Sequence, residues 1–114
     1  MGNSLLIVPM RYYSLEKYIN LFDGYRKVFK IDSHNLMLLQ LDGARYLIES
    51  NCPHREYPLS SSDVSGMELV CPQHAYRFDI RNGELTHFSE EPCRNLRCYE
   101  VIDRDNEVGV MLDG

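Results

Sequence analysis

Two short segments of the chain each place one cysteine and one histidine close together. The first is a C-x-H pair formed by Cys52 and His54, and the second is a C-x2-H pair formed by Cys71 and His74. Sixteen residues separate the two pairs. Thiolates and imidazoles are both good ligands for transition metals. We therefore expect the chain to fold so that the two pairs face each other across one metal centre.

Two kinds of metal centre use two cysteines and two histidines. A structural zinc ion usually takes both cysteines from one element and both histidines from another, and a C-x-H pair is tight for two ligands of one ion. The alternative is a two-iron, two-sulfide cluster in which two histidines replace two cysteines on one iron. Each loop then gives its cysteine to one iron and its histidine to the other. The mixed pairs favour the cluster, and zinc remains the alternative.

The rest of the chain consists mainly of short β-prone segments separated by turn residues. An Asp-Gly pair at 42–43 and an Asn-Gly pair at 82–83 predict tight hairpins. The exception is residues 14–22, where apolar side chains spaced three and four apart behind Ser14 predict a helix. The expected strands are residues 5–10, 28–30, 36–41, 44–49, 67–70, 76–80, 84–88, 98–103 and 108–112. This pattern predicts an all-β sandwich or barrel.

Composition and charge exclude several classes of protein. The chain has 114 residues, enough for one domain, and its 44% hydrophobic and 25% charged content is not that of a disordered protein. A net charge of −5 argues against nucleic-acid binding. The sequence holds no apolar run long enough to span a membrane and no recognisable secretion signal. We expect a cytoplasmic protein, in which cysteines serve as thiols or metal ligands.

The two cysteine–histidine segments resemble the Rieske iron–sulfur family. They read CPHREYPL from residue 52 and CPQHAYRFDIRNGE from residue 71, and are most similar to soluble Rieske-type ferredoxins and related domains of ring-hydroxylating oxygenases. The resemblance is specific over residues 52–84 and fainter over about 5–112. It implies a single Rieske domain over 1–114, an antiparallel β-sandwich or barrel with a small inserted cluster-binding subdomain at about 50–84.

The resemblance also implies the ligands of one [2Fe-2S] cluster per chain. Cys52 and Cys71 are expected to bind the inner iron through sulfur. His54 and His74 are expected to bind the outer, more exposed iron through Nδ1. Catalytic residues are not expected, because the chain shows no dinucleotide fingerprint or catalytic triad.

The function implied by the resemblance is electron transfer. We expect a monomeric carrier that takes an electron from a flavin reductase and docks transiently on a terminal oxygenase or similar acceptor, without membrane or nucleic-acid partners. One alternative is a small subunit of a larger redox enzyme, like the Rieske-like subunit of NAD(P)H-dependent nitrite reductase. Another is a β-domain interaction module with structural zinc or no metal.

Several positions depart from the family pattern or lie outside it. Glu56 and Ala75 stand where low-potential relatives usually have glycine, a residue that permits backbone geometry others resist. Cys93 and Cys98 form a C-x4-C pair that we interpret as free thiols rather than a disulfide. Residues 91–99 resemble a proline-bearing loop that covers the cluster in relatives.

The sequence predicts a reduction potential at the low end of the Rieske range of about −150 to +300 mV. High-potential relatives have a disulfide between the two loops, and Tyr57 and Gln73 stand at its two positions. Those relatives also donate hydroxyl hydrogen bonds to the cluster from a serine and a tyrosine, where this chain has Tyr76 and Phe78. A redox titration checks the prediction, and a midpoint near the high end contradicts it.

Overall fold

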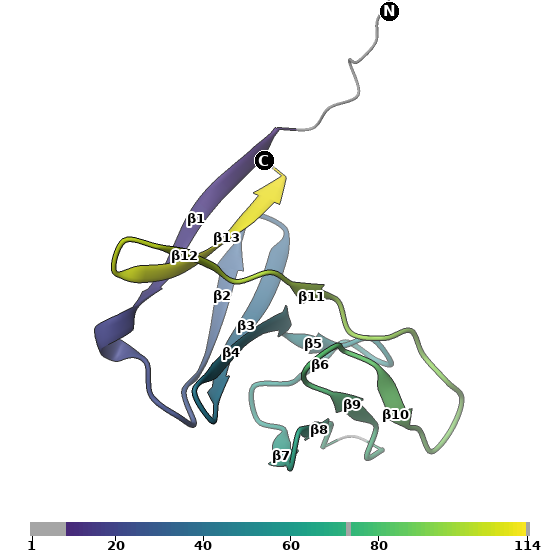
Figure 1. Ribbon diagram of the computed structural model, residues 1–114. Coiled ribbons are helices and arrows are strands. Elements are labelled where there is room, and N and C mark those ends of the chain that lie inside the picture. The colour runs from purple at the N-terminus through teal and green to yellow at the C-terminus, as the bar shows by residue number, and fades with distance from the viewer. Residues whose placement is uncertain (1–8, 73, 114) are drawn as a thin grey trace, which may run out of the picture. The chain divides into compact units, whose positions relative to one another are not determined.

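The computed structural model describes residues 9–72 and 74–113, and the fold of this part is antiparallel and all-β (Figure 1). Its strands belong to two compact units. The first comprises residues 9–21 and 100–113, and the second is Phe22–Tyr99. The all-β class predicted from the sequence is confirmed. In the described part of the chain, no helix is long and apolar enough to cross a membrane.

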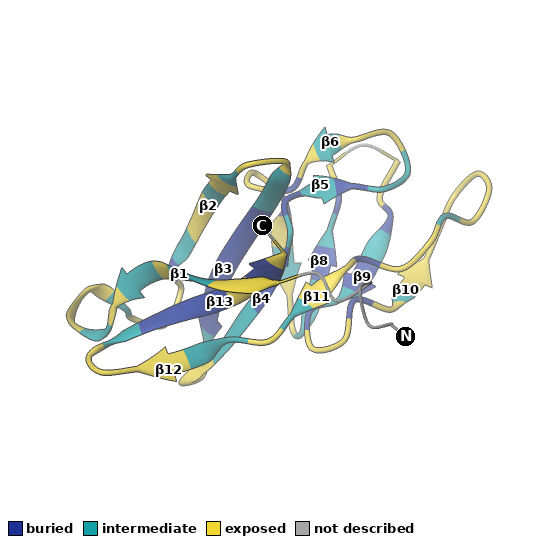
Figure 2. Cartoon of the chain, turned by 90° about the horizontal axis from the view of Figure 1, so that it is seen from above, coloured by how far each residue is buried: buried dark blue, intermediate teal, exposed yellow. Residues whose placement is uncertain are grey.

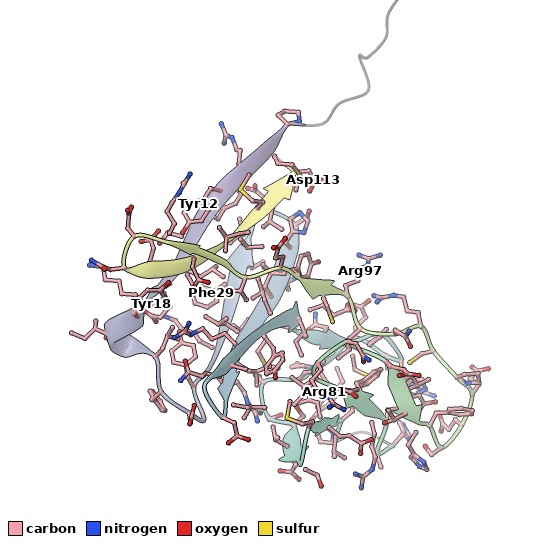
Figure 3. All side chains as sticks on the ribbon, in the orientation of Figure 1. Tyr12, Tyr18, Phe29, Arg81, Arg97 and Asp113 are labelled. Carbon is pink, nitrogen blue, oxygen red and sulfur yellow. The ribbon has the colours of Figure 1, made fainter. Side chains whose placement is uncertain are left out.

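The first unit is a three-stranded sheet with the order β1-β13-β12. Its strands are β1 (Met10–Lys17), β12 (Ile102–Arg104) and β13 (Glu107–Asp113). Two tyrosine hydroxyls contact acids of this sheet: Tyr12 donates to Glu107 at 2.8 Å, and Tyr18 donates to Asp103 at 2.7 Å. Figure 3 labels both tyrosines. A turn at residues 105–106 joins β12 to β13.

The predicted helix over residues 14–22 is wrong. The chain continues as β1 to Lys17 and then forms only a 3-10 turn at Tyr18–Asn20. Pairing with β13 satisfies the backbone of this segment, and the Tyr12 ring packs so closely over Gly109 that a Cβ there would lie 2.4 Å from it. An isolated helix of nine residues is marginal, so pairing with β13 prevails. Most of the predicted strand at 5–10 lies outside the described residues.

The larger sheet of the second unit has the order β11-β4-β3-β2. Its strands are β2 (Arg26–Ile31), β3 (His34–Leu41), β4 (Ala44–Glu49) and β11 (Cys98–Tyr99). The hairpin predicted at residues 42–43 is confirmed by the pairing of Leu41 with Ala44. The predicted strand at 98–103 is in fact two, because its first residues pair with β4 and its last with β13.

Two smaller elements of the second unit carry the cysteine–histidine segments. The first element is a ribbon of β5 (Asn51–Cys52) and β6 (Tyr57–Pro58). The second is a sheet with the order β10-β9-β8-β7. Its strands are β7 (Asp63–Ser65), β8 (Glu68–Val70), β9 (Arg77–Asp79) and β10 (Leu85–His87). Each segment therefore occupies the turn of an antiparallel pair.

One apolar core joins these sheets within the second unit. Buried residues of the larger sheet, such as Met37 and Ile48, pack in the same cluster as Leu69 and Phe78 of the smaller one. The most deeply buried strand is β3, which has five consecutive buried residues (Figure 2). Such a run is typical of a strand covered on both faces.

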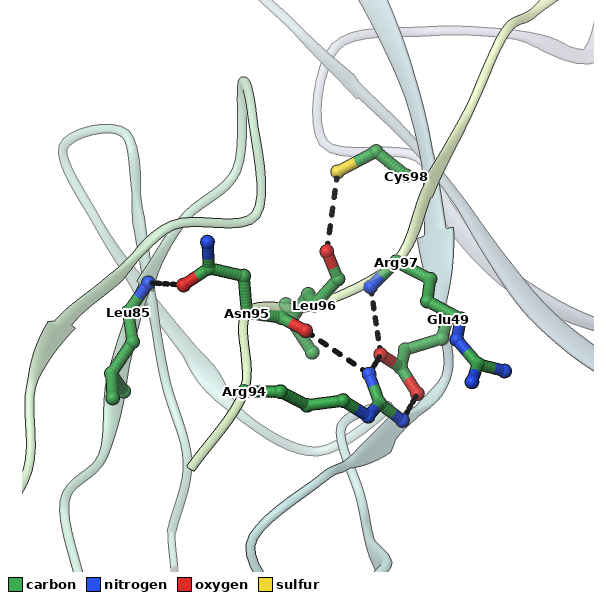
Figure 4. Close-up of polar contacts among 7 residues, drawn as sticks. All are labelled: Glu49, Leu85, Arg94, Asn95, Leu96, Arg97 and Cys98. Atoms are coloured by element: carbon green, nitrogen blue, oxygen red, sulfur yellow. Dashed lines mark hydrogen bonds and ion pairs between the residues drawn. The ribbon is translucent and has the colours of Figure 1, made fainter. Parts of the chain in front are cut away.

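The connection from β10 to β11 is fixed by polar contacts. The Arg94 guanidinium donates to the Glu49 carboxylate at 2.5 and 3.0 Å, and the backbone N–H of Arg97 donates to the same carboxylate at 2.7 Å (Figure 4). The Asn95 side chain accepts from the backbone N–H of Leu85 at 2.9 Å. These hydrogen bonds therefore hold the connection between β10 and β11 in one conformation.

Gly83 should tolerate a side chain far less well than Gly43. Both glycines have positive φ, +77° at Gly83 and +79° at Gly43. A Cβ added at Gly83 would lie 2.3 Å from the backbone oxygen of Leu96, whereas a Cβ added at Gly43 would meet no atom within 4 Å. We expect Gly83→Ala to lower the free energy of unfolding by about 3 kcal/mol or more, and Gly43→Ala by about 1 kcal/mol. Urea denaturation measures both, and equal losses would contradict the close approach at Gly83.

Candidate metal centre

The first cysteine–histidine segment is a tight turn between β5 and β6. Cys52 pairs with Tyr57 across the ribbon, and the backbone N–H of Glu56 donates to the Cys52 carbonyl at 2.6 Å. Glu56 has a φ of 59°, a left-handed conformation that costs a residue other than glycine about 1–2 kcal/mol. The conformation at Glu56 therefore matches the glycine that relatives usually carry there.

The second segment repeats this construction between β8 and β9. The backbone N–H of Cys71 donates to the Tyr76 carbonyl at 2.7 Å. His74 and Ala75 have φ values of 63° and 54°, so this turn is also left-handed. Gln73, expected at a disulfide position of high-potential relatives, lies outside the described residues. Both segments thus place a cysteine where the turn begins and a histidine within the turn.

The two thiols meet inside the core. Cys52 and Cys71 are each only 1% exposed. Burial is the main cause that raises the pKa of the Cys52 thiol to about 12. The neighbouring Cys71 also raises this pKa, while a hydrogen bond from the backbone N–H of His54 opposes the rise. Without a metal this thiol is protonated at neutral pH, and a metal ligated here displaces the proton.

The two imidazoles also lie together, nearer the surface. Their ring centroids are 5.4 Å apart and their planes are perpendicular. The His54 side chain is 8% exposed and the His74 side chain 33% exposed. The buried ring of Tyr76 stacks on His54 with centroids 4.1 Å apart and an angle of 16° between the planes. His54 is therefore held by packing, whereas His74 forms the more accessible edge.

A third segment, residues 88–92, contacts both loops. The Ser89 hydroxyl donates to the His74 carbonyl at 2.7 Å, and the Tyr76 hydroxyl donates to the Glu91 carbonyl at 2.5 Å. The Glu90 carboxylate lies between the histidines, with Oε1 3.2 Å from Nε2 of His54 and Oε2 3.5 Å from Nδ1 of His74. No sequence motif marks Glu90 as part of a site.

The ring nitrogens bear on how each histidine would bind iron. His54 turns Nε2 to Glu90, which leaves its Nδ1 for a metal. His74 turns Nδ1 to Glu90, so binding through Nδ1 requires this more exposed ring to turn. Coordination of both histidines through Nδ1 stays a prediction.

The donor set fits a two-iron cluster better than a single ion. The two thiols form one buried pair and the two imidazoles form another. A cluster with two cysteines on one iron and two histidines on the other requires this division.

The remaining cysteines lie elsewhere. Cys93 packs against the core of the second unit, and the Cys98 thiol makes a weak 3.8 Å contact with the Leu96 carbonyl. Both are free thiols, as predicted, and burial raises the pKa of each. Two arginines near the cysteine–histidine turns form ion pairs, Arg55 with Glu90 and Arg77 with Glu68.

Comparison with known proteins gives a family match over most of the chain. A family model described as "Rieske [2Fe-2S] domain" matches residues 12–100. The ferredoxin component of the naphthalene 1,2-dioxygenase system of Pseudomonas putida is 26% identical over 83 residues, which cover 73% of this chain and 76% of that protein. The match includes both cysteine–histidine segments.

Two further matches differ in how much of the other protein they cover. The solved ferredoxin of carbazole 1,9a-dioxygenase from Nocardioides aromaticivorans IC177 is 26% identical, with a TM-score of 0.73 over 87% of this chain and 95% of that one. A 4β-methylsterol monooxygenase of Methylococcus capsulatus is 46% identical over 37 residues. That match spans only 10% of the monooxygenase, so its activity does not carry over.

Ala75→Gly should stabilise the protein, because Ala75 has a φ of 54° that glycine adopts without strain. We expect a gain of up to about 1 kcal/mol in the free energy of unfolding. Ala44→Gly is the matched control, since Ala44 lies in β4 with ordinary strand geometry. There glycine should cost about 0.5–1 kcal/mol. A loss at both positions in urea denaturation would contradict strain at Ala75.

Proposed function

Because the chain belongs to the Rieske [2Fe-2S] domain family, we propose that it carries one electron at a time on a Rieske [2Fe-2S] cluster between a reductase and an oxygenase or similar acceptor. The observation that carries this proposal is the meeting of two buried thiols and two imidazoles from separate hairpin turns. Such a cluster, when bound, accepts and releases one electron.

We assign Cys52, Cys71, His54 and His74 as the cluster ligands. The cysteines lie in the core, where water is excluded and two thiolates gain from binding iron rather than remaining as buried charges. The histidines lie toward the surface, and His74 is the more exposed. The imidazole edge of His74 is therefore the proposed exit and entry point for the electron.

The chain's own residues prepare the site for this exchange. Stacking by Tyr76 fixes the His54 ring, and the hydroxyl of Tyr76 fixes the segment that carries Glu90. The backbone N–H of His54 donates to the Cys52 sulfur, an interaction that persists when the sulfur is a thiolate. Rigid ligands reduce the rearrangement that accompanies a change of charge.

The proposed partners are a flavin reductase and a terminal oxygenase or similar acceptor. Both the Pseudomonas and the Nocardioides relatives are named as ferredoxins of dioxygenases, so the carrier and the oxygenase are separate components there. We accordingly propose a carrier that is not itself a catalyst. A net charge of −5 favours transient docking on a basic surface, which should weaken with salt.

We further propose that residues 1–114 act as one monomeric Rieske domain in the cytoplasm, with the cluster held by the segment at about 50–84. Four cysteines without a disulfide suit a reducing compartment. The turns that carry the proposed ligands lie within this segment, between β5 and β6 and between β8 and β9.

The ligand assignment predicts that two of the four cysteines and two of the four histidines are required for cluster binding, and that the other four residues are not. Replacing any proposed ligand, cysteine by serine or histidine by glutamine, should abolish the Rieske-type visible absorption and lower the iron content at least tenfold. The control variants are Cys93→Ser, Cys98→Ser, His34→Gln and His87→Gln, which should retain both. Loss of the cluster in a control variant that still folds, or its retention in a ligand variant, contradicts the assignment.

A further inference from the structure

We propose that Glu90 is a positioning residue that orients His54, and that its carboxylate, which also lies beside His74, lowers the reduction potential of the site. Among the residues described, Glu90 is the carboxylate in contact with both proposed histidine ligands. The inference rests on the proposed function, because it concerns the ligands assigned there.

The contact with His54 is the stronger of the two. Glu90 Oε1 lies 3.2 Å from Nε2 of His54, whereas its Oε2 lies 3.5 Å from Nδ1 of His74. A metal-bound histidine commonly donates its other ring N–H to a carboxylate, which fixes the ring and makes the imidazole a stronger donor to the metal. The His54 side chain is 8% exposed and the Glu90 side chain is 42% exposed, so this contact is shielded from water on the histidine side and open to it on the carboxylate side.

Neighbouring contacts hold the carboxylate in this place. On one side of Glu90, the Ser89 hydroxyl donates to the His74 carbonyl. On the other side, the Glu91 carbonyl accepts from the hydroxyl of Tyr76, whose ring stacks on His54. Residues 89–91 are thus attached to the same loops that carry the histidines, and Glu90 is not a freely moving surface acid.

The Glu90 carboxylate lowers the reduction potential in two ways. Reduction adds a negative charge to the site, and a carboxylate beside the histidines disfavours that charge. A carboxylate beside the outer ring nitrogen of a histidine ligand also makes the imidazole a better electron donor, which favours the oxidised metal. Arg55 opposes both effects, because its guanidinium lies 3.3 Å from Glu90 Oε1, but at 63% exposure its charge is strongly screened.

The test compares three variants of similar size in the cluster-loaded protein. Glu90→Gln removes the charge between the histidines. Glu91→Gln removes an equal charge from the adjacent residue, whose described contact uses only its backbone carbonyl. Arg55→Gln removes the opposing charge. A redox titration followed by circular dichroism or EPR gives each midpoint potential.

We expect Glu90→Gln to raise the ratio of reduced to oxidised protein about tenfold at a fixed potential, a positive shift of about 59 mV for a one-electron couple. Glu91→Gln should change that ratio by less than about twofold, and Arg55→Gln should shift the midpoint slightly in the negative direction. Shifts of opposite sign at Glu90 and Arg55 support an electrostatic role, since general damage to the fold would not reverse with the charge removed.

An unshifted Glu90→Gln, or an equal shift in Glu91→Gln, overturns the inference while leaving the proposed function intact. If Glu90→Gln does not load, Arg55→Gln decides, and an unchanged or raised midpoint in that variant overturns the inference. A wild-type protein that never holds a cluster overturns the proposed function itself, and this inference with it.

Discussion

The contact between two buried thiols from separate hairpins is the interaction on which the site depends. Cys52 and Cys71 lie in the same apolar cluster as Leu69 and Phe78, so core packing brings both sulfurs together. Each histidine follows its cysteine within a tight turn and is carried toward the surface. The same pair of tight turns therefore both buries the thiols and brings the imidazoles toward the surface.

The same arrangement explains how a small chain separates holding a cofactor from exchanging an electron. The core excludes water from the thiols at one end of the site, while the more exposed His74 ring lies at the other end, where we propose that the electron enters and leaves. The segment carrying Ser89, Glu90 and Glu91 joins the accessible end through contacts with His74, His54 and Tyr76. This third segment therefore supplies the charged neighbour of the two histidines, Glu90.

The sequence predicted features whose causes are local. The turns at residues 42–43 and 82–83 have residue types that require particular backbone angles, and the two cysteine–histidine pairs have a spacing that few sites share. The predictions were wrong where pairing between segments far apart in the chain determines the secondary structure. Residues 14–17 have helical spacing but pair with β13, and residues 98–103 divide between two sheets. Glu90 was missed because its partners lie in loops far from it in the chain.

We propose that the two hairpin turns hold one two-iron cluster on two thiolates and two imidazoles. EPR spectroscopy of the anaerobically purified, dithionite-reduced protein, combined with iron and sulfide analysis, tests this arrangement. We expect two irons and two acid-labile sulfides per chain and a reduced spectrum of the Rieske type. A protein that holds one zinc ion, or that stays colourless and silent after reconstitution with iron and sulfide, would contradict it.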